Sequence, residues 1–597
     1  MSASFVGMHL LIHTLRHLRP VQIYRRPWTR LIRPRPRLAP PPVLRHWRGD
    51  WSGAAARKPS ILNLRRIRLL EVEHELVVAD DWQAPDHSDL FRYNLHYFDD
   101  LNALGARDRR EWHSALIERW IAENPPGKGV GWAPYPTSLR MVNWIKAALS
   151  GFELPAEAVH SLAVQGRWLE RRLEWHLLGN HLFANAKALV FAGCYFEGSE
   201  ADGWLGTGLR ILARELPEQV LPDGGQFELS PMYHALAFED LLDLVNLAAA
   251  FRGRIDTAVV DSWRQAAIRM WRWLRVMTHP DGELAFFNDT AIGVAPSNGE
   301  LEAYALRLGI EAPEGEPFDR FGTSGQGDGG ASLDTLRTGG QGGGEATFGG
   351  LRTGGDGAGS VEDADPGAGL IHLPGSGYLR LSHGPATLFL DCARIGPDYL
   401  PGHAHADQLS FELSIGARRV LVNTGIDRYG TDAERVRQRG TAAHNCVVVD
   451  GQDSAEVWSG FRVARRGYPL DLVATKSEAL LEVACSHTGY RRLPGRVLHR
   501  RRWRLEAGQL LIEDRLSGRF GQAEAWFHLH PDIVVKLDDP RKARISLPDG
   551  RLIGLSIEGG SARLQPSQWR PGFGRSLDTQ VVVVALNDTG LTTIWRW

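Results

Sequence analysis

The spacing of apolar residues changes once along this chain, and that change divides the chain into two structural parts. From about residue 89 to residue 309, apolar residues recur at intervals of three and four, as in SLRMVNWIKAALSGF and HALAFEDLLDLVNLAAAF, which predicts amphipathic helices. After residue 375 the interval falls to two, as in ATLFLDCA and QLSFELSIG, which predicts strands. The 597 residues also exceed one ordinary core, so we expect two or more domains.

The connections between these segments predict the architecture. Short turns containing Gly or Pro separate successive helices, and such helices form antiparallel hairpins that can curve into a toroid or solenoid. Many strands joined by short turns form an antiparallel sandwich. We therefore predict a multidomain α+β protein with a helical domain over 89–320, a β-sandwich over 371–597 and a cleft between them.

Two further segments differ in composition from these domains. Residues 1–88 form a lead-in whose first 49 residues carry ten Arg and no Asp or Glu, with Pro clustered from Pro34 to Pro42. Such a segment can be an arm that contacts a membrane surface or a partner, or a solvated and partly helical lead-in, which is the interpretation we favour. Residues 321–370 are rich in Gly and poor in apolar residues, which predicts a flexible insertion rather than a phosphate-binding loop.

Charge and hydropathy exclude several classes of function. The formal net charge is −1, so no global field attracts nucleic acid. No run of about 18 apolar residues predicts a transmembrane helix. The apolar run from Phe5 to Leu15 is short, contains His9 and His13, and precedes no small-residue cleavage site, so it is not a convincing secretory signal. We expect a cytoplasmic or membrane-associated protein, with the periplasm as an alternative.

Histidines in the predicted β domain form one candidate site. In LPGHAHADQLSFEL, His403 and His405 are two residues apart, so in an extended segment both point to one face. His444 lies in TAAHNCVVVDG and Asn423 in LVNTG. His405, Asn423 and His444 could surround a cation, although a neutral amide binds zinc weakly and makes such a site poor.

Residues at the starts of two predicted helices form a second candidate site. Asn180 and His181 open the helix in LLGNHLFANAKAL, and Tyr233 lies early in the helix of SPMYHALAFEDL. Asn180 is either the N-cap of its helix or an amide that meets an anion at the positive helix end. Tyr233 is either a core residue or, in a cleft, a proton donor.

These segments together resemble a known family. In chain order, GNHL, DGGQFELSPMYH, GHAHADQLSFEL, LVNTG, TAAHNCVVVDG and SAEVWSGFR resemble the heparinase II/III family of polysaccharide lyases, in particular a bacterial branch that accompanies polysaccharide biosynthesis genes. The resemblance runs from RPVQIYRRPWTRL to the last strands and leaves out the Gly-rich insertion. It implies an incomplete (α/α) toroid joined to an antiparallel β-sandwich. It also implies a lyase that cleaves a uronate-containing acidic polysaccharide by β-elimination.

The resemblance further implies roles for individual residues. Asn180 with His181 would neutralise the uronate carboxylate, Tyr233 would protonate the glycosidic oxygen or also act as the base, and His403 would be the general base. His405 and His444 match the ligands of a structural metal, zinc, in some members. Asn423 stands where those members have an acidic ligand, which puts the metal in doubt, and the reaction itself requires no cofactor.

Aromatic and arginine side chains are candidates for binding the polymer. Trp132 and Tyr135 in GVGWAPYPTSLR and Trp458 in EVWSGFR are suited to stacking on sugar rings. Arg140 and Arg462 could hold carboxylates or sulfates, as could Arg92 and Arg435. The chain has 20 Trp, and we assign most of the others to helical packing.

Two other functions compete with the lyase. A glycoside hydrolase on the same scaffold needs two carboxylates across the scissile bond, for which Glu228 with Asp223 or Asp289 is available. A non-catalytic polysaccharide-binding protein of exopolysaccharide or capsule biosynthesis would explain the basic N-terminal segment.

Overall fold

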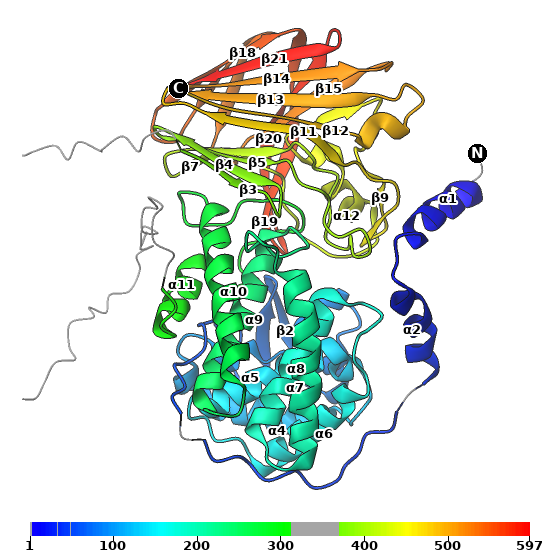
Figure 1. Ribbon diagram of the computed structural model, residues 1–597, viewed down its shortest axis with the longest axis vertical. Coiled ribbons are helices and arrows are strands. Elements are labelled where there is room, and N and C mark those ends of the chain that lie inside the picture. The colour runs from blue at the N-terminus through cyan, green and yellow to red at the C-terminus, as the bar shows by residue number, and fades with distance from the viewer. Residues whose placement is uncertain (1–2, 33, 48, 312–368) are drawn as a thin grey trace, which may run out of the picture.

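The computed structural model describes residues 3–32, 34–47, 49–311 and 369–597. The predicted Gly-rich insertion over 321–370 therefore lies almost entirely outside the described residues. In Figure 1 the helices gather in one half of the molecule and the sheets in the other. The predicted order, a helical domain followed by antiparallel sheets, is confirmed.

Helical hairpins form the first domain as an incomplete (α/α) toroid. Helix α7 packs against both α5 and α8, and α9 packs against α7, α10 and α11. Polar caps fix where several helices begin, because a side-chain oxygen accepts a backbone N–H of the first turn: Ser230 caps α9, Asp256 caps α10 and Ser297 caps α11. The described α-helices are α1 (Ala3–Leu15), α2 (Pro20–Leu31), α3 (Asp89–Asn94), α4 (Arg110–Glu123), α5 (Pro134–Leu149), α6 (Ala156–Glu170), α7 (Gly179–Tyr195), α8 (Ser199–Gln219), α9 (Pro231–Ala250), α10 (Thr257–Val276), α11 (Asn298–Arg307) and α12 (Ala433–Gln438).

Three large antiparallel sheets form the second domain, together with the two-stranded β9–β10 sheet. The strand orders of the large sheets are β11-β12-β13-β14-β21-β18-β17-β16, β3-β4-β5-β6-β7 and β19-β20-β15-β8. The described strands are β1 (Arg66–Leu69), β2 (Val72–Glu75), β3 (Gly369–Leu373), β4 (Tyr378–His383), β5 (Ala386–Asp391), β6 (Phe411–Ile415), β7 (Arg418–Leu421), β8 (Val447–Val449), β9 (Val457–Trp458), β10 (Arg462–Val463), β11 (Pro469–Lys476), β12 (Leu480–His487), β13 (Leu498–Glu506), β14 (Gln509–Ser517), β15 (Ala523–His528), β16 (Val534–Asp539), β17 (Lys542–Ser546), β18 (Leu552–Glu558), β19 (Gly560–Gly572), β20 (Arg575–Leu586) and β21 (Gly590–Arg596).

The sheets share one sandwich core. Leu388 of β5, Val447 of β8 and Trp503 of β13 belong to the same buried apolar cluster, although they come from three different sheets. Along β13 every second residue is buried, as expected for a strand with one face on a core.

A separate apolar cluster joins the two domains. Trp273 and Val276 of α10 pack with Tyr378 of β4 and Phe389 of β5. The Tyr378 hydroxyl donates to the carbonyl of Leu229, just before α9, at 2.7 Å. This buried contact holds the ends of the toroid helices against the β domain and so fixes the geometry of the space between them.

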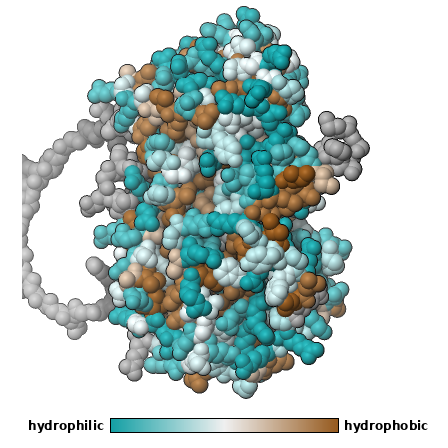
Figure 2. All heavy atoms as spheres, turned by 45° about the vertical axis from the view of Figure 1, so that its right-hand side comes forward, coloured by the Kyte–Doolittle hydropathy of each residue, from teal (hydrophilic) through white to brown (hydrophobic). Residues whose placement is uncertain are grey.

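The N-terminal segment lies along the side of this junction (Figure 1). It forms α1 and α2, and the lead-in also contains the small β1–β2 hairpin. Thr14 of α1 donates to the carbonyl of Val463 at 3.3 Å, and the buried Gln22 of α2 donates to the carbonyl of Tyr399 at 3.1 Å. Figure 2 shows apolar patches on the side of the molecule that carries this segment. Among the described residues, no helix combines the length and the hydropathy needed to cross a membrane.

Candidate functional site

A cavity of about 1120 Å³ opens where the toroid, the β domain and the N-terminal helices meet. The four predicted catalytic residues, Asn180, His181, Tyr233 and His403, all line it. The first three come from the helical domain and His403 comes from the loop between β5 and β6. The structure thus brings together residues that are more than 200 positions apart in the sequence.

Two helix N-termini supply the residues of the helical wall. Helix α7 begins at Gly179, with Leu178 as its N-cap, so the alternative that Asn180 is the N-cap is wrong. Asn180 and His181 instead occupy the first turn, where the helix dipole and the unpaired backbone N–H groups favour an anion. Tyr233 is the third residue of α9, so a second helix N-terminus borders the same cavity.

Tyr233 and His403 form the closest pair of the site. Their ring centroids are 3.8 Å apart in a stacked arrangement. The Tyr233 hydroxyl oxygen lies 3.0 Å from that of Tyr429. Burial and the contact with Tyr429 raise the pKa of Tyr233 well above its ordinary value. Tyr233 therefore carries its proton at neutral pH and is suited to donate it.

A buried carboxylate organises the histidines. Asp289 Oδ2 lies 2.9 Å from Nδ1 of His403, and Asp289 Oδ1 lies 2.8 Å from Nε2 of His405. The guanidinium of Arg435 donates to both carboxylate oxygens at 2.6 Å. Burial raises the pKa of Asp289, but the charge of Arg435 and the hydrogen bonds from the imidazoles outweigh it and hold the pKa well below its ordinary value.

The ionised Asp289 determines the tautomer of His403. A carboxylate only accepts hydrogen bonds, so the ring proton of His403 lies on Nδ1. The lone pair of Nε2 is then free to accept a proton. This is the arrangement that a general base requires.

Carboxylates also flank His181. Its Nδ1 lies 3.3 Å from Oε2 of the buried Glu174. Burial lowers the pKa of His181, but the charge of Glu174 outweighs it, and the pKa is raised. The Glu228 carboxyl, 3.8 Å from Nε2 of His403, has its pKa raised by burial. The cationic form of His181 is therefore favoured relative to that of an ordinary histidine.

The backbone next to these residues is strained. Leu178, Leu229 and Asn288 have φ values of 64°, 60° and 53°, a region that L-residues with bulky side chains avoid. They flank the Asn180 turn, the start of α9 and Asp289. Backbone strain of this kind is retained where the surrounding structure enforces it, and it is concentrated at functional sites.

Three of the predicted sugar-binding residues lie at the cavity or beside it. Tyr135 lines it, with its ring centroid 4.5 Å from that of His181. Arg462 also lines it, and its guanidinium lies 4.8 Å from the ring of Trp458. The half-buried Trp458 donates from Nε1 to the Thr14 hydroxyl at 3.1 Å, so it packs between Arg462 and the N-terminal segment.

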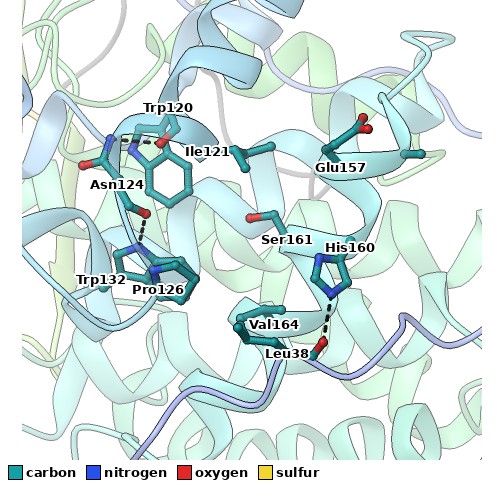
Figure 3. Close-up of a pocket in the computed structure, with 11 residues that line it drawn as sticks. Leu38, Trp120, Ile121, Asn124, Pro126, Trp132, Glu157, His160, Ser161 and Val164 are labelled. Carbon is teal, nitrogen blue, oxygen red and sulfur yellow. Dashed lines mark hydrogen bonds between the residues drawn. The ribbon is translucent and has the colours of Figure 1, made fainter. Parts of the chain in front are cut away.

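Two of the predicted sugar-binding residues lie elsewhere, which corrects the prediction. Arg140 is fully buried in the toroid, where it donates to Gln165 at 3.0 Å and its guanidinium lies 3.8 Å from the ring of Trp120. Trp132 is buried beside a second cavity of about 400 Å³ and donates to the carbonyl of Asn124 at 3.0 Å (Figure 3). Both side chains stabilise the helical core and do not reach the cleft.

The predicted metal ligands are also corrected in one position. Both polar atoms of the buried Asn423 amide already have partners, because its nitrogen donates to the carbonyl of Phe286 at 2.7 Å and its oxygen accepts from the Asn445 N–H at 3.2 Å. Ligand atoms of His405, His444 and Asp407 instead lie within 4.8 Å of one another. The acidic member of this cluster therefore comes from the HAHAD segment itself.

Neither of the two carboxylate pairs considered for a hydrolase is available in the described part of the chain. Asp223 accepts hydrogen bonds from the backbone and hydroxyl of Ser376, and so joins the two domains. Asp289 is fully buried and occupied by Arg435 and two histidines. Neither carboxylate is free to face Glu228 across a glycosidic bond.

Sequence reasoning missed the functions of Glu174, Tyr429 and Arg435. We expected Arg435 to hold substrate, but it is fully buried and holds Asp289. No local pattern marks these residues, because their partners are distant in sequence. For Asp289, the partner of Arg435, the sequence does offer a signal. The polar NDT triplet follows the apolar AFF segment, which places the Asp289 carboxylate where the chain leaves a core.

Comparisons with known proteins agree with this arrangement. A family model described as "Heparinase II/III N-terminus" matches residues 106–299, and one described as "Heparinase II/III-like, C-terminal" matches residues 365–597. Among solved structures, heparinase III has a TM-score of 0.64 at 17% identity, covering 86% of this chain and 78% of that chain. A heparan sulfate lyase HepC mutant from Pedobacter heparinus has a TM-score of 0.57 at 17% identity, covering 96% and 87%. These structural likenesses show the fold.

The curated relatives match over different shares of the chain. A heparin-sulfate lyase of Bacteroides stercoris is 44% identical over 71 residues, which are 12% of this chain and 11% of that enzyme. FtsZ-localized protein C of Caulobacter vibrioides is 27% identical in an alignment 492 residues long that covers 76% of this chain and 72% of that protein. The chain thus matches a small part of the curated lyase and most of the second relative.

Proposed function

Because the chain belongs to the heparinase II/III family, we propose that it is a polysaccharide lyase that cleaves a uronate-containing acidic polysaccharide by β-elimination. One observation carries the proposal: Asn180, His181, Tyr233 and His403 line the same cavity. Within it, a protonated Tyr233 is stacked on a histidine whose tautomer Asp289 determines. Elimination from a uronate needs a carboxylate neutraliser, a base and an acid, and these side chains supply all three.

The first requirement is to stabilise the anion that forms when C5 of the uronate loses its proton. In the proposed complex the uronate carboxylate faces Asn180 and His181 at the N-terminus of α7. The positive helix end, the amide of Asn180 and the cationic form of His181 then stabilise charge that develops on the carboxylate as C5 loses its proton.

The second requirement is to move two protons. Nε2 of His403 takes the C5 proton, and the electron pair forms the C4–C5 double bond. The bond from C4 to the glycosidic oxygen breaks, and the Tyr233 hydroxyl donates a proton to that oxygen. Since Tyr233 keeps its proton at neutral pH, we assign the acid role to Tyr233 and the base role to His403.

Uncompensated cations on the cavity wall support an acidic substrate. Arg26 of α2 and Arg462 of β10 both line the cavity. Burial and the charge of Arg462 lower the pKa of Arg26, so the two guanidinium groups repel each other. Neither has a carboxylate partner within the described part of the chain, so an anionic group of the polymer would relieve their repulsion.

The decisive experiment is to mix the purified full-length chain with a panel of uronate polysaccharides and follow the ultraviolet absorbance of the unsaturated product. The panel includes heparan sulfate, chondroitin sulfate, alginate and the exopolysaccharide of the source organism. Growth of the absorbance with one polymer supports the lyase and identifies its substrate class. Cleavage without the absorbance would indicate hydrolysis, because a hydrolysed uronate lacks the conjugated double bond.

A second candidate is binding of an acidic polysaccharide without cleavage. The observation that favours it is that a relative matching 76% of this chain is named FtsZ-localized protein C rather than a lyase. Retention of polymer by the chain with no absorbance change for any member of the panel would support this candidate over the lyase.

The pH dependence of the proposed reaction tests the role of His181. Glu174 raises the pKa of His181, so the cationic form of His181 extends to higher pH than in an ordinary histidine and is lost as pH rises through that pKa. The value of kcat/KM should therefore fall on the alkaline side. Glu174→Gln removes the negative charge that raises the pKa of His181. In this variant we expect the alkaline fall of kcat/KM to move to lower pH.

The control for this prediction is Glu170→Gln, which removes an exposed carboxylate from the neighbouring helix α6. Its profile of kcat/KM against pH should match that of the unsubstituted chain. If the alkaline fall of kcat/KM occurs at the same pH in Glu174→Gln, it does not report the titration of His181, and the cationic form of His181 is not required for the reaction.

We further propose that His405, Asp407 and His444 hold a structural divalent metal, zinc. Burial lowers the pKa of His405 to about 4 and that of His444 well below its ordinary value, so both imidazoles are neutral and offer lone pairs. Nδ1 of the buried His444 has no hydrogen-bond partner among the described residues. Two histidines and one carboxylate are suitable zinc ligands, and the metal would tie the HAHAD segment to the strand entrance at His444.

Metal content tests this assignment. We expect about one zinc per chain after purification, as for a structural site, and its loss in His444→Ala together with a lower melting temperature. His487→Gln, which alters a buried histidine elsewhere in the β domain, should keep the metal. A metal-free chain that melts at the same temperature with and without added zinc would contradict the proposal.

A further inference from the structure

The N-terminal helices present two different faces. The inner face lies on the cleft, where Leu11 and Leu15 of α1 and Gln22 of α2 line the cavity. The outer face is apolar and open to solvent: Ile12 of α1 is 58% exposed and Leu31 of α2 is 81% exposed. A helix that is apolar on its solvent side leaves a surface without a partner.

This apolar exposure is concentrated in one short part of the chain. Nine of the 24 large apolar side chains that are exposed in the described structure lie between residues 8 and 32. They are Met8, Leu11, Ile12 and Leu15 of α1, Ile23, Tyr24, Trp28 and Leu31 of α2, and Ile32 directly after α2. Leu11 and Leu15 also line the cavity, whereas Met8 and Ile12 on α1, and Tyr24, Trp28 and Leu31 on α2, do not line it and recur at intervals of three and four, so they form one outer stripe on each helix. Figure 2 shows apolar patches on the side of the molecule that carries the N-terminal segment.

Arginines accompany the stripe. Arg19 is paired with Glu218 and lies over the ring of Tyr399, so it anchors the helices to the body of the protein. Arg16, Arg25 and Arg30 have no carboxylate partner in the described ranges. The first acidic residue of the sequence is Asp50, so no acid within the segment neutralises them.

We propose that the outer face of α1 and α2 docks on a bilayer surface that contains anionic phospholipid. Aliphatic side chains enter the headgroup boundary, Trp and Tyr settle at the interface, and unpaired arginines meet lipid phosphates. A soluble acidic polymer would account for the arginines but not for the aliphatic stripe. Because the inner face borders the cleft, docking would hold the cavity close to the membrane.

Co-sedimentation with vesicles tests the proposal on the full-length chain. We compare vesicles of phosphatidylcholine with vesicles that also contain phosphatidylglycerol. Binding should require phosphatidylglycerol and should weaken as salt rises, because the arginines act through the surface potential. The double variant Ile12→Glu with Leu31→Glu places a charge in each apolar stripe, and we expect its partition coefficient to fall at least about tenfold.

A matched control separates docking from general hydrophobicity. Leu104 and Leu306 are 64% and 55% exposed but lie outside the N-terminal helices, so Leu104→Glu with Leu306→Glu should bind like the unsubstituted chain. Neither double variant touches a cavity-lining residue, and equal melting temperatures would show that both are folded. The proposal is overturned if phosphatidylglycerol adds no binding, or if the two double variants bind equally. If the chain binds soluble acidic polysaccharide but not vesicles, and the Ile12→Glu with Leu31→Glu variant loses this binding, the outer face binds the polymer instead of a membrane.

Discussion

In Tyr233→Phe, we expect kcat of the proposed lyase to fall by about 10²- to 10⁴-fold with KM changed far less, as is typical when a general acid is removed. The substitution keeps the ring that stacks on His403 at 3.8 Å and removes the hydroxyl that would protonate the glycosidic oxygen. Binding of the polymer depends on other groups, so the loss appears in the chemical step. Initial rates of absorbance increase at several polymer concentrations separate kcat from KM.

Tyr429→Phe is the matched control for this prediction. Its hydroxyl lies 3.0 Å from that of Tyr233, and its removal leaves the Tyr233 hydroxyl in place, so we expect a loss below about tenfold. If Tyr429→Phe instead abolishes turnover while Tyr233→Phe does not, Tyr429 is the proton donor. If both variants keep full activity, a tyrosine acid is not part of the reaction.

In Arg435→Met, we expect a loss of about 3–5 kcal/mol in the free energy of unfolding, because a buried carboxylate is left without its cation. Both oxygens of Asp289 accept from Arg435 at 2.6 Å, and the pair is fully buried. Activity should fall as well, since the same carboxylate orients His403. The measurement is urea unfolding followed by circular dichroism.

Two comparisons make this prediction specific. Arg437→Met on the same helix removes an exposed pair with Glu434 and should change the free energy by less than about 0.5 kcal/mol. Adding Asp289→Asn to Arg435→Met removes the unpaired charge and should restore part of the stability. Full stability of Arg435→Met would show that the pair does not support the fold.

The pH dependence of the Arg435→Met effect has a definite sign. The folded-state pKa of Asp289 is depressed in the unsubstituted chain, so its contribution is present above the unfolded pKa, about 3.9, and is lost as pH falls. The difference in the free energy of unfolding between the unsubstituted chain and Arg435→Met should therefore have its largest value at neutral pH and should decrease as the pH becomes acidic.

Periodicity alone predicted the fold class. The change from intervals of three and four to intervals of two reflects which faces of each element are buried, and burial is the same wherever the element later packs. The gathering of Asn180, His181, Tyr233 and His403 at one cavity was expected from the resemblance of short motifs to the heparinase II/III family. Each motif lies at the end of an element, where the chain leaves the core and side chains can face a cleft.

Tertiary packing decided which neighbouring residues reach that cleft. Trp132 and Arg140 lie in the same local sequence as Tyr135, yet both are buried in the toroid while Tyr135 lines the cavity. Periodicity shows that a residue has a buried face but not which neighbour covers it. A Trp or Arg whose polar atoms find partners inside the core satisfies the pattern as well as one that meets a ligand.

The charge network at the centre of the site also could not be predicted from the sequence. Asp289 and Arg435 are separated by 146 positions, and Asp407 rather than Asn423 completes the cluster with His405 and His444. The sequence by itself determined the elements, their order and the residues at their ends, because these depend on interactions over a few residues. Partner choice among charged and polar side chains depends on distances of a few ångströms between segments far apart in the chain, and only the packed structure determines those distances.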